Sequence, residues 1–109
     1  MKAFEICGNT VTFTGATSAP TPVQCVGNNK ERNPQYVLTN IGLVGVFVGW
    51  GQTADVASLN AVIPTATSRY GYYLLPGTQI TITAMPSAYF TGITASSTAI
   101  VYVTPGNGE

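Results

Sequence analysis

Charged residues are scarce in this chain of 109 residues. It has four basic and four acidic residues, 7% of the total, where an average soluble domain has about 25%. Residues 33–54 and 70–108 contain none at all. Because a free monomer relies on charge to stay unassociated, and interface cores are the places where charge is depleted, we expect a partner to cover much of this surface. The alternative is a monomer solvated by its Thr, Ser, Asn and Gln side chains.

Histidine is absent, which excludes Ser-His-Asp and Cys-His catalytic arrangements. The remaining acids are too few and too scattered to predict a carboxylate pair. Gly49-Trp50-Gly51 follows an expected strand, but no helix or Lys follows it, so no phosphate-binding loop is predicted. We therefore expect no enzyme activity, no catalytic residues and no cofactor. The four acidic residues of the chain are Glu5, Glu31, Asp55 and Glu109.

Cysteine is also rare, with only Cys7 and Cys25. Neither has a second cysteine at Cys-x-x-Cys spacing, so no metal site is predicted. The sequence leaves a disulfide between them open. It favours two reduced thiols, because residues 1–5 include an acid that does not fit the start of a signal peptide.

The formal net charge is zero, and four basic residues do not form the clusters that bind nucleic acid. The charged segment Lys30-Glu31-Arg32 is expected to be a solvated loop. No apolar run reaches the roughly 18 residues of a membrane span. We therefore expect no nucleic-acid or membrane partner, and synthesis in a cytoplasm.

Short runs of Thr, Val, Ile, Tyr and Phe alternate with polar residues and are separated by Gly, Pro and Asn. This pattern predicts one all-β domain over residues 1–109, an antiparallel, jelly-roll-like β-sandwich of roughly eight to ten short strands. Gly8-Asn9 is expected to be the turn of an N-terminal hairpin. Residues 43–50 are apolar on both faces, which predicts a central strand. Its glycines are expected to mark either a bulge or the close approach of another backbone.

Three further local predictions concern turns and strand ends. Residues 54–59 are too short for a structural helix and are expected to form a crossover loop. Pro76-Gly77 predicts a type II turn. A final strand over residues 99–103 is expected to end at Pro105-Gly106.

Aromatic side chains are the remaining candidates for a binding site. Tyr and Trp offer large contact area at low entropic cost, either as a platform for sugars or as anchors of a protein interface. Tyr72 and Tyr73 are neighbours in an expected strand, so one of them should point outward. The predicted interface set is Trp50, Tyr70, Tyr72, Tyr73, Tyr89 and Phe90.

From residue 36 onward the order of segments resembles the small β-sandwich decoration, or cement, proteins of short-tailed bacteriophage heads. The resemblance lies in LTNIG (38–42), VFVGWG (46–51), AVIP (61–64), LLPGT (74–78), FTGITAS (90–96) and AIVYVTPG (99–106). It implies a subunit that associates with itself, as a homodimer or homotrimer, and clamps neighbouring major capsid proteins on the outside of the virion. The family offers no catalytic residues to transfer.

The leading hypothesis is therefore a structural virion protein that decorates and stabilises a capsid. A head-to-tail connector or a tail component is an alternative within the same particle. A carbohydrate-binding module that uses Trp50 and the tyrosines is an alternative from a different class.

Overall fold

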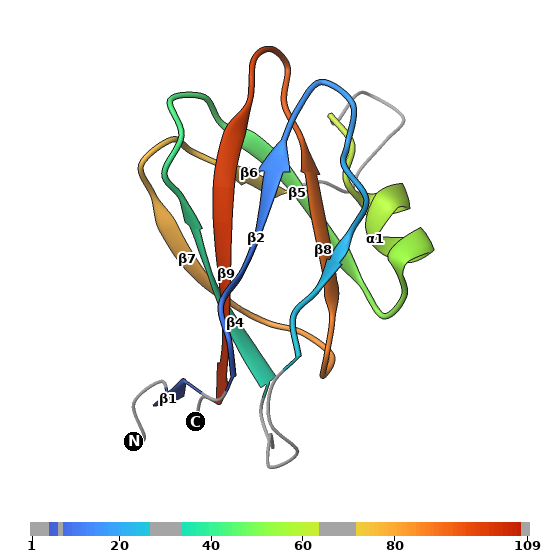
Figure 1. Ribbon diagram of the computed structural model, residues 1–109, viewed down its shortest axis with the longest axis vertical. Helices are drawn as coiled ribbons and strands as arrows, with labels where there is room; N and C mark the ends of the chain where they lie inside the picture. The colour runs from blue at the N-terminus through green and yellow to red at the C-terminus, as the bar shows by residue number, and fades with distance from the viewer. Residues whose placement is uncertain (1–4, 7, 27–33, 64–71, 108–109) are drawn as a thin grey trace.

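The computed structural model describes residues 5–6, 8–26, 34–63 and 72–107. Within these ranges it contains nine strands and one helix (Figure 1). The elements are β1 (Glu5–Ile6), β2 (Val11–Gly15), β3 (Val23–Gln24), β4 (Pro34–Asn40), β5 (Val46–Gly51), α1 (Ala54–Asn60), β6 (Tyr72–Leu74), β7 (Gln79–Thr83), β8 (Tyr89–Ile93) and β9 (Ala99–Asn107).

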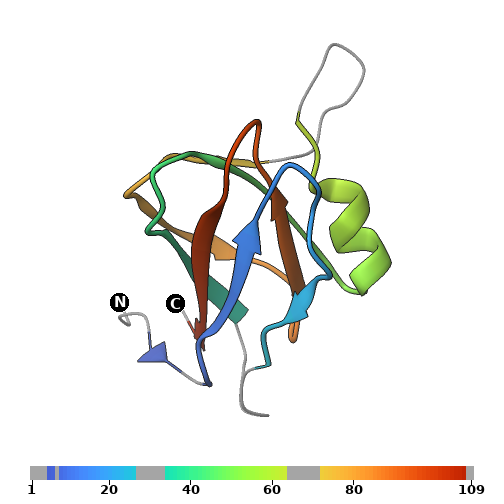
Figure 2. The ribbon, with the colours of Figure 1, turned by 45° about the horizontal axis from the view of Figure 1, so that its top comes forward.

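The strands form two antiparallel sheets packed face to face (Figures 1 and 2). One sheet has the order β2-β9-β4-β7, and β1 also pairs with β9; the other has the order β3-β8-β5-β6. From β2 onward every consecutive pair of strands lies in opposite sheets except β5 and β6, which are neighbours. This is the strand order of a jelly roll, so the predicted all-β sandwich is confirmed.

The hydrophobic core lies between the two sheets and follows the alternation of the strands. Tyr36 and Leu38 of β4 are buried together with Val101 and Val103 of β9. The Tyr36 ring meets Phe90 of the other sheet edge to face, with centroids 4.9 Å apart. Burying one such side chain stabilises the fold by about 1.5–3 kcal/mol. Further core members are Phe13, Cys25, Val46, Val48, Leu74, Ala88 and Ala99.

The predicted central strand is confirmed as β5, which lies between β8 and β6. One face packs on the core, and α1 covers part of the other. The helix comes so close that a Cβ added at Gly49 would lie 2.3 Å from the Ala61 backbone nitrogen. The glycine therefore makes room for backbone, as predicted.

The prediction of a crossover loop over residues 54–59 is wrong, because Ala54–Asn60 forms α1. Thr53 caps the helix, and its hydroxyl accepts a hydrogen bond from the Val56 N–H at 3.3 Å. At the other end the Asn60 side chain donates to the Trp50 carbonyl at 2.9 Å. Tertiary contact with β5 stabilises a helix that is too short to be stable alone.

The predicted N-terminal hairpin is also wrong. β1 and β2 do not pair with each other, and each pairs with β9 instead, Ile6 opposite Gly106 and Val11 opposite Val103. β9 extends to Asn107, past Pro105, where the sequence predicted its end. The long β9 offers one continuous edge with which both strands pair.

Candidate functional site

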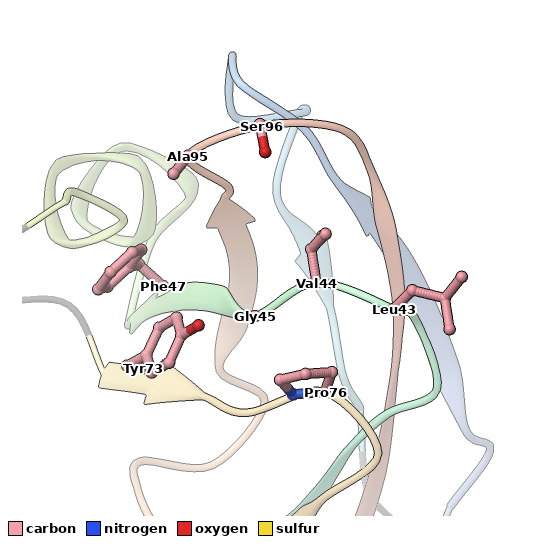
Figure 3. A pocket seen from close by; sticks show the side chains of 8 residues that line it. All are labelled: Leu43, Val44, Gly45, Phe47, Tyr73, Pro76, Ala95 and Ser96. Carbon is pink, nitrogen blue, oxygen red and sulfur yellow. The ribbon is translucent and has the colours of Figure 1, made fainter.

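An apolar groove lies at one end of the sandwich (Figure 3). It has a volume of about 390 Å³ and is formed by the β4–β5 loop, β5, β6, the β6–β7 turn and the β8–β9 loop. The rings of Phe47 and Tyr73 lie together at one side, and Leu43 lies at the other and points away from them. The lining residues are Leu43, Val44, Gly45, Phe47, Tyr73, Pro76, Ala95 and Ser96.

Asn40, the last residue of β4, holds two walls of the groove together. Its fully buried side chain donates hydrogen bonds of 3.0 Å to the carbonyls of Val44 and Leu74. Its Oδ1 accepts a bond of 2.8 Å from the Gly42 N–H. Because these partners belong to the β4–β5 loop and to β6, one amide fixes the loop against the neighbouring strand.

The floor of the groove depends on Gly45. A Cβ added there would lie 2.2 Å from the Tyr73 ring, so the ring lies directly over bare backbone. Tyr73 also contacts Phe47, with ring centroids 4.7 Å apart and planes tilted by 40°. Phe47 and Tyr73 are opposite each other on β5 and β6, on the face directed away from the core.

Pro76 reaches the groove on a tight turn. Gly77 has φ of +72°, and the Thr78 N–H donates to the Leu75 carbonyl at 3.3 Å. The backbone therefore has the positive φ that a type II turn requires at its third residue. The turn predicted at Pro76-Gly77 is confirmed.

The rim of the groove is apolar and unusually exposed. Leu43, which lines the groove, is 95% exposed. Ile41 and Leu75, which lie next to the lining segments in the chain, are each more than half exposed. The segments that form the rim carry no charged residue. Leu43 is so exposed that it contacts almost nothing in its own chain. An exposed leucine next to an apolar groove is typical of surfaces that bind another protein.

The groove offers contact area and hydroxyl groups. Its lining includes no acid, base or thiol, and its hydrogen-bonding side chains are those of Tyr73 and Ser96. Across the part of the chain that the structure describes, no group of three His, Cys, Asp or Glu residues could hold a metal ion. In the same part, no helix is long and apolar enough to cross a membrane.

The predicted aromatic set is divided by the fold. Tyr73 lines the groove and Tyr72 is its neighbour on β6. The sequence predicted that one of the two points outward, and both are exposed. Trp50 packs against the core, 6.3 Å from Phe90 between ring centroids. Phe90 itself is fully buried, so it is not available as a surface anchor.

Two further predicted positions lie elsewhere. Tyr89 is half-buried on β8, paired with Gln24 of β3 and Gly51 of β5. Tyr70 lies outside the described residues. The set therefore contributes two neighbouring tyrosines to this end of the molecule, and the other described members do not join them.

Leu43, Phe47, Pro76 and Asn40 were missing from the predicted set. Leu43 lay in the segment predicted as a strand, but β5 begins at Val46 and Leu43 belongs to the preceding bend. The sequence does contain a signal, because Gly42 and Gly45 flank it at turn spacing. An apolar residue in such a turn has no strand neighbour to cover it.

Cys25 is buried, and its thiol lies 3.7 Å from the Val103 carbonyl, to which it donates. This is a position inside the sandwich, away from the groove. Cys7, which the sequence left open as a disulfide partner of Cys25, lies outside the described residues.

Comparison with protein-family models, curated proteins and solved structures finds no match for the chain.

Proposed function

We propose that the chain is a structural virion protein, a decoration subunit that binds the outside of a tailed-bacteriophage capsid and stabilises it by bridging major capsid proteins. The observation that carries the proposal is the uncharged, apolar end of the sandwich, where Leu43 stands 95% exposed beside the groove. The resemblance of the segments from residue 36 onward supports a capsid as the partner. The jelly-roll strand order is compatible with this role, because viral capsid proteins use the same architecture.

The physical argument begins with the cost of leaving this end in water. Ile41, Leu43 and Leu75 are more than half exposed, and covering one of these side chains completely is worth up to about 1.5–3 kcal/mol. None of the described residues that line the groove carries a charge that would have to be dehydrated when a partner binds. A shell presents many identical sites, so modest affinity for each copy is enough for high occupancy.

The test uses capsid shells of the encoding phage assembled without this protein. We expect saturable binding of the purified chain and a higher temperature of shell disruption. Counting bound copies separates decoration from a connector or tail role, because decoration gives a copy number that scales with the shell subunits, while a connector occupies one vertex. Absence of saturable binding would contradict the proposed function.

A pair of matched variants tests the site. Leu43→Asp places a charge at the rim of the groove, and Leu59→Asp places the same charge on α1, at a leucine that is also exposed. We expect Leu43→Asp to weaken shell binding about tenfold or more, the equivalent of about 1.4 kcal/mol, and Leu59→Asp to bind as the unmodified chain does. Equal binding by all three proteins would place the contact elsewhere on the surface.

A further inference from the structure

Strand β7 forms an open edge of the larger sheet (Figure 1). Among the described residues it pairs with β4 alone, from Thr39 opposite Gln79 to Gln35 opposite Thr83. The Asn40 N–H donates to the Thr78 carbonyl at 2.9 Å. Because backbone groups alternate in direction along an antiparallel strand, those of Gln79, Thr81 and Thr83 face away from β4.

This edge lacks the features that usually protect an edge strand from pairing with another chain. It contains no charged residue, no proline and no break in register over its five residues, whereas natural edges carry Lys, Pro or bulges, or are very short. The edges of the other sheet, β3 and β6, have two and three residues. On the far side of the larger sheet, β2 is joined to the second sheet by a bridge between Ala16 and Ile93.

We propose that β7 pairs with β7 of a second copy, antiparallel, about a two-fold axis through Thr81. In this register Thr81 faces the second copy's Thr81, and Gln79 faces its Thr83. These are the residues whose N–H and C=O groups point outward, so each facing pair can exchange two hydrogen bonds. The two larger sheets become one continuous sheet.

The side chains of β7 fit this register. On the outer face the exposed Thr81 meets a second Thr81, a pair that stabilises sheets. On the core side, Ile80 lies opposite the second copy's Ile82. Both isoleucines are half-buried and packed on the core. Pairing with the second copy covers the part of each isoleucine side chain that is exposed at the edge of the sheet.

Charge also favours a second copy as the occupant. Identical surfaces in contact repel each other if they carry charge, but residues 70–108 carry none. The alternation of polar and apolar residues in QITIT (79–83) reads the same in both directions, so an antiparallel copy places isoleucine against isoleucine at every inner position. A two-fold contact of this kind is closed and leaves no further β7 edge.

The test is the solution mass of the chain alone, measured by sedimentation at total concentrations up to about 1 mM, a range that covers weak association. We expect twice the 11.4 kDa of one chain. Thr81→Lys and Thr81→Glu each place like charges across the two-fold axis, and each should weaken dimerisation about tenfold or more. Mixing the two variants should restore the dimer, because opposite charges then meet.

Thr14→Lys is the matched control, since Thr14 is exposed on β2 at the far side of the same sheet. It should leave the mass unchanged. The proposed pairing is overturned if the wild-type chain is a monomer. It is also overturned if both Thr81 variants still form the dimer, or if the two variants stay monomeric when they are mixed. Shells are absent from this experiment, so its failure is separate from failure of the proposed capsid binding.

Discussion

Replacing Asn40 with alanine tests whether one buried amide holds the groove together. Asn40→Ala removes the donors to the Val44 and Leu74 carbonyls and the acceptor for the Gly42 N–H. The bond to Leu74 is buried, and losing it leaves a carbonyl unsatisfied at a cost of about 1–3 kcal/mol. The other two bonds are partly buried, so water can replace the side chain and each costs about 0.5–1.5 kcal/mol. The expected loss is about 2–6 kcal/mol.

That loss is a large fraction of the roughly 5–15 kcal/mol that stabilises a typical domain. Urea unfolding followed by Trp50 fluorescence measures it, since Trp50 packs on the core. Asn60→Ala is the control: it removes one partly buried bond to the Trp50 carbonyl and should cost about 0.5–1.5 kcal/mol. If Asn40→Ala costs no more than Asn60→Ala, the amide does not organise this end of the sandwich.

Two other predictions follow from the glycines and from the lack of charge. Gly49→Ala should destabilise the fold by about 1–3 kcal/mol or more, because the added methyl meets the backbone of α1. Gly45→Ala should destabilise it less, because its methyl meets the movable ring of Tyr73. Equal losses of stability in urea unfolding would contradict this difference. Shell binding should change little between about 0.01 and 1 M salt, because the described residues that line the groove carry no charge. A steep salt dependence in a binding titration would show that charged residues make the contact.

Much of the fold could be predicted from short runs of strand-forming residues. Residues 79–83 alternate polar and apolar side chains and form β7. Residues 36–39 are rich in aromatic and apolar side chains and form part of β4, with Tyr36 and Leu38 inside. Alternation does not identify the partner of a strand. Gly8-Asn9 suits a hairpin locally, but β1 and β2 both pair with the long β9. The short α1 is stabilised by packing on β5, where Gly49 leaves the backbone bare.

The groove was harder to predict because no single segment encodes it. Its walls come from residues 43–47, 73–76 and 95–96, which the sandwich brings together. Tyr73 was predicted for its chemistry, but the aromatic criterion also selected Phe90, which the core buries. The more informative signal was an apolar residue, Leu43, between two turn glycines, where burial within the chain is not available.

In a dimer paired through β7, the two grooves lie at opposite ends of the shared sheet. The β6–β7 turn that carries Pro76 enters β7 at Gln79, and Gly77 is four residues from the proposed axis at Thr81. At about 3.4 Å per residue, the two Gly77 positions are about 27 Å apart along the strand direction. The two apolar ends then point in opposite directions, so one dimer can contact two separate capsid subunits. A monomer has one such end, and self-association is therefore what would turn a subunit that binds a shell into one that bridges it.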